Sequence, residues 1–437
     1  MLSAFASAFR TPDLRKKLLF TLAILALYRF GASVPTPDTN TKAINACIKQ
    51  AGSGANASIY SLINLFSGGA LLRLSAFALG IMPYITASII IQLLVVVIPR
   101  FESLKKEGQA GQQKLTQYSR YLTIGLAILQ STGFIALAKS GQLFPQCQGS
   151  ILYKQSIPTL ATMVLCMTAG TAVIMWLGEL ITDRGVGNGM SVLMFTSIAA
   201  RIPSEGNTIF KNAGGFVFTL IVMLGLAIIV AVVFVEQAQR RIPVQYAKRM
   251  IGRRQYGGTS TYLPLKVNQA GVIPVIFASS LLYIPQLISQ LTGNSSNNSA
   301  FQRFVQNYLL RQQSAVYILV YFALIIFFTY FYVGITFDPA ERADDMKKYG
   351  GFIPGIRPGR PTAEYLQYVL SRITFPGSLY LGIVAVLPNF FFSLTSGNNQ
   401  NFPFGGTAVL IMVGVGLDTV KQIESQLMQR NYEGFLR

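Results

Sequence analysis

The sequence carries apolar runs that follow one another almost from end to end. A hydrocarbon core about 30 Å thick takes about 20 helical residues to cross. The runs therefore predict ten membrane spans, at residues 18–34, 74–98, 121–138, 157–177, 186–200, 213–235, 270–291, 315–337, 373–394 and 405–417. The fifth and tenth are short and rich in glycine. Charged residues make up only 12% of the chain, which excludes an ordinary soluble domain.

Basic residues gather on one side of the expected membrane. An even number of spans places both termini on the same side, together with the basic segments 100–120, 236–269 and 336–372. Because loops rich in lysine and arginine stay in the cytoplasm, we expect both termini to be cytoplasmic. The charged cluster at 13–17 is typical of a retained anchor before the first span rather than of a cleaved signal peptide.

Several kinds of chemistry are excluded by the residue types present. The chain has no histidine, which removes Ser-His and Cys-His catalysis as well as histidine-ligated metals and haem. It also has no Gly-x-x-x-x-Gly-Lys-Ser/Thr phosphate loop. We therefore expect no enzyme activity, cofactor or metal site, so a partner protein or a gradient must supply energy for any work.

The chain contains three cysteines. Cys166 falls in the fourth span and is expected to be inert. Cys47 and Cys147 both fall in expected external loops, where oxidation is permitted. A Cys47–Cys147 disulfide and two free thiols both stay open, because the sequence does not give the Cα distance that a bridge requires.

The stretch Leu62–Leu72 is apolar but too short to cross a membrane, since a helix over it rises only about 16 Å. Ser67, Gly68 and Gly69 interrupt it, and Leu74–Ile98 beyond it is long enough to span. We interpret Leu62–Leu72 as a re-entrant half-segment, because irregular backbone at membrane depth survives only within protein or beside a watery cavity. An amphipathic helix on the membrane surface is the alternative.

Two sequence matches predict an internal repeat. Residues 80–88, GIMPYITAS, match 271–279, GVIPVIFAS, and residues 189–194, GMSVLM, match 406–411, GTAVLI. Both partners lie five spans apart, so an inverted-topology repeat with a pathway between its halves is expected. The shared Gly-x-x-Pro is expected to kink each helix near a central constriction. Chance similarity between apolar helices is the alternative.

The repeat divides the chain into two halves flanked by polar segments. We expect a cytoplasmic N-terminal segment at 1–17, a first half at 18–202 that includes 62–72, a second half at 203–420 that includes loops 236–269 and 336–363, and a cytoplasmic tail at 421–437. The two loops are predicted to lack clear secondary structure and to dock an acidic or RNA-rich partner. Ordinary loading of cytoplasmic loops with positive charge is the alternative.

Six motifs carry a resemblance to a known family. They are INLFSGGALLRLSAFALGIMPYITASIIIQLL, KKEGQAGQQKLTQYSRY, MWLGELITDRGVGNGMS, QRRIPVQYAKRM, LPLKVNQAGVIPVIFASS and GGFIPGIRPGRPTAEYL. Together they resemble the SecY family, the central subunits of bacterial protein-translocation channels, along the whole chain. The resemblance implies an all-α polytopic membrane protein, with ten transmembrane helices in two inverted five-helix halves around a central hourglass pore.

The resemblance also implies a function. The chain would form a protein-conducting channel in the bacterial plasma membrane, passing unfolded secretory proteins across it and releasing hydrophobic segments sideways into lipid. Its expected partners are the small membrane subunits SecE and SecG, the SecA ATPase, the ribosome, polypeptides that bear signal sequences, and the lipid bilayer, with no direct DNA binding. An external motor or the ribosome would drive transport.

The resemblance implies an apolar pore ring and a plug that closes it. The ring residues would be Ile81, Ile85, Met190, Met194, Ile276 and Ile411. The family favours isoleucine at these positions, and the two methionines predict a softer but intact seal. The plug would be residues 62–72, with Leu62, Asn64, Phe66, Gly68, Gly69 and Leu72, hinged at the two glycines.

Two further groups of site residues follow from the resemblance. A polar patch of Thr86, Gln130 and Asn268 would lie at a lateral gate, where spans two and three meet spans seven and eight. Alternatively, each of these side chains is satisfied within its own helix. SecA or the ribosome would dock at basic residues, foremost Arg357, and then Arg240, Arg241, Lys248 and Arg249.

A secondary transporter for a small solute is the rival interpretation, because transporters also use inverted repeats and broken helices. Such proteins usually carry an acid or base inside the membrane for coupling. Here the span interiors are nearly free of charge, and Glu179 and Asp418 fall at predicted span ends. A membrane enzyme is less supported still, since no nucleophile-base pair or metal-ligand cluster appears.

Overall fold

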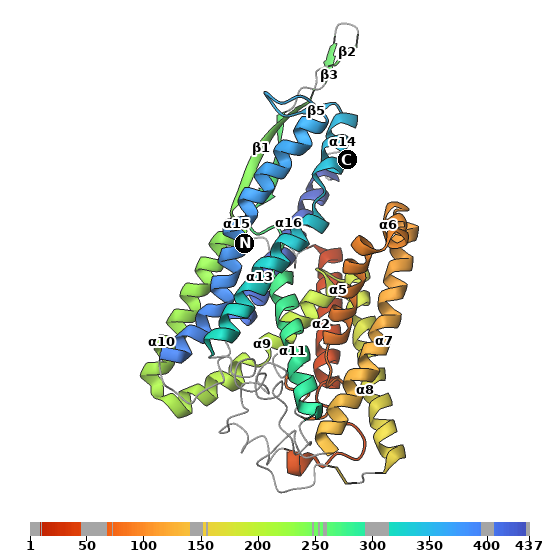
Figure 1. The fold of residues 1–437 in the computed structure, drawn as a ribbon, viewed down its shortest axis with the longest axis vertical. Helices are drawn as coiled ribbons and strands as arrows, with labels where there is room; N and C mark the ends of the chain where they lie inside the picture. Colours follow the sequence, from red (N-terminus) through yellow and green to blue (C-terminus); the bar gives the residue numbers. More distant parts are fainter. Residues whose placement is uncertain are drawn as a thin grey trace.

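The computed structural model describes residues 9, 11–44, 68–71, 73–139, 152–153, 156–246, 249–251, 254–256, 260–292, 314–394 and 406–433. Each expected span contains a helix (Figure 1). The first half holds α2 (Pro12–Gly31), α5 (Met82–Val97), α7 (Gln109–Lys139), α8 (Ile157–Arg184) and α9 (Gly189–Ala199). The second half holds α10 (Ile202–Gln237), α11 (Ile273–Thr292), α13 (Ala315–Thr336), α15 (Arg360–Leu394) and α16 (Gly406–Glu433).

The described helices include five that are long and apolar enough to cross a membrane. These are Ile157–Arg184, Gly214–Gln237, Ala315–Lys348, Arg360–Leu387 and Gly406–Met428. A sixth span arises if α5 and the short α6 (Pro99–Lys106), which meet at a 100° bend, count as one. Two shorter apolar helices accompany them, α9 and Ile273–Leu282. The chain is thus a multi-pass α-helical membrane protein.

The two Gly-x-x-Pro motifs begin helices rather than kink them, so the predicted kinks are wrong. Gly80 and Gly271 have φ values of +57° and +62°. Pro83 lies in the first turn of α5, and Pro274 is the second residue of α11. Proline suits a first turn, where its missing N–H costs no hydrogen bond, and glycine accepts the left-handed conformation just before it. The second helix therefore starts at Met82, not at Leu74.

The two halves share a close packing contact in the segments that precede α5 and α11. In the first half, Gly170 of α8 lies against the carbonyl of Ala76, in the turns that precede α5. In the second half, Gly377 of α15 lies against the carbonyl of Val267, in the linker that precedes α11. A Cβ at either glycine would overlap that carbonyl oxygen. Because α8 and α15 are five spans apart, the two close approaches correspond.

A second pair of close approaches follows the same rule. Gly189 begins α9 and lies against the backbone of Gly178 in α8. Gly406 begins α16 and lies against the backbone of Val384 in α15. These are the glycines that the second sequence match aligned, so that match corresponds to a shared contact and not only to shared apolar composition.

The segment 236–269 is largely a β-hairpin, and the prediction of an unstructured loop there is wrong (Figure 1). Strand β1 (Gln239–Tyr246) pairs antiparallel with β4 (Ser260–Lys266), and β5 (Gly351–Phe352) pairs with the other edge of β1. Strands β2 (Arg249–Ile251) and β3 (Arg254–Tyr256) form a second small ladder. Alternating burial is typical of such strands, and here Ile242 and Val244 are buried between exposed neighbours.

Other polar segments are also more ordered than expected. Residues 100–120, predicted as a loop, are mostly helical in α6 and the start of α7. The segment 336–363 contains the helix α14 (Pro339–Lys348), whose first turn Asp338 caps, as well as β5. The hairpin, α14 and α6 gather toward one end of the molecule (Figure 1). The helix α16 runs on through the expected start of the C-terminal tail to Glu433.

Candidate pore constriction and gate

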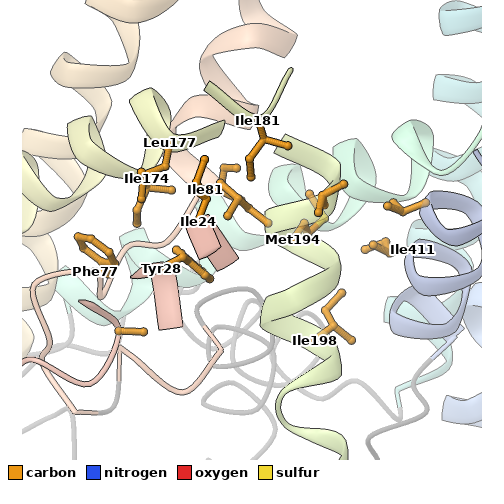
Figure 2. Close-up of a cluster of buried hydrophobic side chains, with 14 of the residues drawn as sticks. Ile24, Tyr28, Phe77, Ile81, Ile174, Leu177, Ile181, Met194, Ile198 and Ile411 are labelled. Carbon is orange, nitrogen blue, oxygen red and sulfur yellow. The ribbon is translucent and has the colours of Figure 1, made fainter. Parts of the chain in front are cut away.

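The six predicted ring residues lie in one apolar cluster that joins the two halves. Ile81, Met194, Ile276 and Ile411 are buried in it, while Ile85 and Met190 are partly buried and packed against it. Figure 2 shows Ile81, Met194 and Ile411 among its members. Four separate helices or helix starts thus contribute side chains to a single apolar cluster.

The helix starts explain why these side chains converge. Ile81 immediately precedes α5, and Ile85 and Ile276 fall in the first turns of α5 and α11. Met194 and Ile411 fall in the second turns of α9 and α16. Repeat-related residues therefore occupy matching places in their helices. An apolar constriction of this kind can exclude water and ions by dewetting.

Polar contacts join α2, α9 and the Gly68 turn beside this apolar cluster. The buried hydroxyl of Tyr28 on α2 lies 2.6 Å from that of Ser197 on α9. The neighbouring Arg29 donates from Nη1 to the carbonyl oxygen of Gly68 at 2.8 Å. A Cβ on Gly68 would meet the Ser197 backbone at 3.3 Å. The Gly68 turn is therefore fitted between α2 and α9.

The plug prediction is described only in part. Gly68 and Gly69, its expected hinge, have φ values of +63° and +91°, which glycine adopts without strain. Leu62, Asn64, Phe66 and Leu72 lie outside the described residues, as do Cys47, Cys147 and Lys248. Cys166 is a free, half-buried thiol in α8.

The three expected gate residues are not joined by any hydrogen bond that the structure describes. The helix α11 does contact both α5 and α7, as the gate requires. Thr86, however, donates to the Met82 carbonyl of its own helix at 3.0 Å. For Thr86 the structure therefore agrees with the alternative interpretation, in which the side chain is satisfied within its own helix. Gln130 is half-buried on α7. Asn268 is buried, and its bonds run toward α10 and the start of α11.

The residue that Asn268 contacts is Glu236, which the sequence prediction missed. Glu236 is only 8% exposed and accepts a hydrogen bond from Asn268 Nδ2. In the sequence it is the single acid of an otherwise basic segment, at the end of an apolar run. A single acid next to an apolar run could have indicated a special role for Glu236. Because the segment was predicted to be a loop, however, its carboxylate was expected to be exposed to water.

A second acidic residue also proves to be structural. Glu179 on α8 receives two hydrogen bonds from the guanidinium of Arg120 on α7, at 2.8 and 2.9 Å. Arg120 also donates to Gln117 at 2.9 Å. This bidentate pair fastens α7 to α8. Glu179 is thus matched by a fixed cation, and the pair joins two helices of the first half.

The predicted docking residues that the structure describes lie toward one end of the molecule. Arg240 and Arg241 are exposed on β1, and Arg249 lies on β2. Arg357 is exposed in the turn after β5. The hydroxyl of Thr362 donates a hydrogen bond to the Arg357 carbonyl oxygen at 2.8 Å. Because β5 pairs with β1, this turn stands beside the hairpin. The two basic segments form one continuous protrusion (Figure 1).

This arrangement defines a polytopic α-helical channel, in which two repeat-related sets of helices meet at one apolar cluster. The SecY family model matches residues 75–420, and the chain belongs to the SecY family. It is 68% identical over 441 residues to protein translocase subunit SecY of Mycobacterium bovis, with both chains covered completely. The SecY subunit of Streptomyces galbus is 65% identical over 443 residues, again with both chains covered completely.

Solved structures share the fold at low sequence identity. A structure described as a protein conducting channel has a TM-score of 0.63 and 18% identity, and the match covers 94% of this chain and 91% of that one. Sec61 from the canine ribosome-channel complex of the endoplasmic reticulum has a TM-score of 0.60 and 18% identity, with the same coverage.

Proposed function

We propose that the chain forms a gated channel that conducts unfolded secretory proteins through the ring of Ile81, Ile85, Met190, Met194, Ile276 and Ile411. One observation carries the proposal: side chains from both halves close a single apolar cluster. Hydrophobic segments would leave sideways into lipid where α11 meets α5 and α7. The names of the SecY relatives support transport of protein rather than of a small solute.

The ring would work as a compliant seal. Apolar side chains make no directional bonds, so a passing chain displaces them without breaking specific contacts. Methionine is unbranched and repacks easily, which suits Met190 and Met194 to close around chains of different width. Residues 62–72 would act as a plug on one side of the ring, with its hinge held by Arg29 through the Gly68 carbonyl.

The energy would come from a partner docked on the basic protrusion. We propose Arg357, Arg240, Arg241, Lys248 and Arg249 as its contacts, with a SecA-type ATPase or a ribosome as the partner. Sec61, a structural neighbour, is part of a ribosome-channel complex. SecE-type and SecG-type subunits would complete the assembly in the bacterial plasma membrane. Both termini and the protrusion would face the cytoplasm, as the distribution of positive charge favours.

Site-specific photocrosslinking tests the channel. A photoreactive residue replaces Ile276, and a secretory chain is stalled midway through export in membranes. We expect crosslinks to the stalled chain, because Ile276 belongs to the constriction through which it would pass. The matched control is Phe327 on α13, whose side chain is 60% exposed on the outer surface of the helices. It should give no such crosslink.

The opposite result would point to the rival function. If Ile276 gives no adduct while the purified protein takes up a small solute into vesicles, the channel proposal fails and a secondary transporter replaces it. Equal crosslinking from Ile276 and Phe327 would also reject the proposed path, because it would show contact without a defined pore.

A further inference from the structure

Glu236 is an unusual residue for its place. Among the side chains whose burial the structure describes, it is the only buried residue with a formal charge. Removing a carboxylate from water costs several kcal/mol unless hydrogen bonds and charges compensate, at about the scale of the stability of a whole domain. A polar but uncharged end to α10 would avoid this cost. The contacts that Glu236 makes therefore indicate what the carboxylate does.

Those contacts join two helices through one amide. Asn268 is 3% exposed, and its Nδ2 donates both to Glu236 and to the carbonyl oxygen of Gly271, at 3.2 Å in the latter case. Glu236 is the next-to-last residue of α10, and Gly271 lies two residues before α11. The Asn268 amide thus links the end of α10 to the start of the helix that carries Ile276.

The Glu236–Asn268 hydrogen bond also joins the two chain segments just outside the β1–β4 ladder, residues 236–238 and 267–268, here called the neck of the hairpin. Gln239 pairs with Lys266 at the base of the ladder, and Val267 N donates to the Ala238 carbonyl at 3.0 Å one step further. Glu236 and Asn268 are the next side chains that meet across the neck. On the other side, Gly377 of α15 lies against the Val267 carbonyl. The linker from the hairpin to α11 is therefore held on both sides, with little room to deform.

We propose that Glu236 is a positioning residue that transmits movement of the β1–β4 hairpin to α11, and through α11 to Ile276 in the ring. The inference rests on the proposed function, because it requires a partner that pushes on the hairpin. With the hydrogen bond in place, the neck and the first turn of α11 move together. Without it, the hairpin tilts while α11 stays in place.

A simpler role for Glu236 would be to balance nearby positive charge. Lys266 and Lys421 both act electrostatically on the carboxylate, as does the acid Asp418. Lys266, however, already pairs with Asp418 at 3.4 Å. The two roles make different demands at position 236. Transmission needs a hydrogen-bond acceptor, which glutamine retains, whereas charge balance needs a negative charge, which glutamine lacks.

The test uses the complete channel in proteoliposomes with its motor ATPase. Glu236→Leu removes the acceptor, Glu236→Gln keeps it, and Asp418→Asn is the control for loss of a neighbouring acid. Two quantities are measured, the affinity for the motor and the translocation rate at saturating motor. We expect Glu236→Leu to bind the motor normally but to translocate about tenfold more slowly, the size of a typical coupling between sites. Normal motor binding also shows that this variant is folded.

The other variants complete the test. Glu236→Gln and Asp418→Asn should translocate as the unsubstituted protein does. The double variant Glu236→Leu/Asn268→Leu should be no slower than Glu236→Leu, because both changes break the same link. The inference is wrong if Glu236→Leu keeps the normal rate, if Glu236→Gln is equally slow, or if affinity and rate fall together. Failure of the unsubstituted channel to translocate would instead contradict the proposed function, and the inference with it.

Discussion

Arg29 ties the end of α2 to the described part of the expected plug. Its guanidinium donates to the Gly68 carbonyl, and because Arg29 is exposed the bond is worth only about 1 kcal/mol. Arg29→Leu should therefore loosen the Gly68 turn and raise the ion leak of the resting channel about fivefold. Conductance across planar bilayers measures this. Export should continue, because the ring itself is unchanged.

The control for this change is Arg73→Leu. Arg73 is an exposed arginine five residues beyond Gly68, so its loss removes the same charge from the same segment. A leak that rises equally in both variants would attribute the effect to charge and would contradict a specific hold on Gly68. An unchanged leak in Arg29→Leu would have the same consequence.

Arg357 is the residue on which the docking proposal depends most. Arg357→Glu reverses an exposed charge in the turn beside the hairpin, so it should repel an acidic partner surface without disturbing the fold. We expect export driven by the motor or the ribosome to fall at least about tenfold while membrane assembly stays normal. Export assays in inverted membrane vesicles measure it. Arg360→Glu is the control, since that side chain is 91% exposed three residues further on. Equal loss in both would show a general charge effect.

At the scale of elements, the glycines of the two halves make a matched prediction. A methyl group at Gly170 or Gly377 would overlap a backbone carbonyl in the segment before α5 or α11, and backbone yields less easily than a side chain. Gly170→Ala and Gly377→Ala should each cost about 1–3 kcal/mol of stability. Thermal unfolding in detergent measures this.

Gly133→Ala is the control for this pair. Gly133 lies inside α7 with open space where its Cβ would be, so alanine should be neutral or slightly stabilising there. If Gly170→Ala lowers the stability and Gly377→Ala does not, the two halves do not correspond in the packing of the segments before α5 and α11.

Elements were predictable from sequence where a local pattern decides them. Apolar length alone located a helix in each of the ten expected spans. The start of α5 was not predictable in this way, because residues 74–81 are as apolar as the helix and only the Gly80 turn separates them. The hairpin was missed because its charged, tyrosine-rich surface hides the short alternation of Ile242 and Val244. Both side chains are buried, and Ile242 packs in a cluster with residues of α13 and α15.

At the scale of the whole molecule, the six predicted ring residues do lie in one apolar cluster, and their role as a pore ring stays a prediction. The resemblance named its six residues, and the internal repeat independently pairs Ile85 with Ile276 and Met194 with Ile411. The partners of single polar residues follow no such rule. Asn268 was predicted to face α5 and α7, yet its bonds lie with Glu236 and Gly271. Such contacts depend on how distant segments close on one another, and no spacing along the chain encodes that.

Four helices have their first or second turns at the proposed ring, and this has an electrostatic consequence. The N–H groups of a first helical turn have no partner within the helix, and a helix start carries about half a positive charge. The starts of α5, α9, α11 and α16 therefore raise the potential around the constriction. At the proposed ring, protons and metal cations would meet a field that opposes them, whereas an unfolded peptide would bring carbonyl oxygens to which first-turn N–H groups can donate. The proposed ring would thus favour polypeptide over the ions whose gradient the membrane must keep.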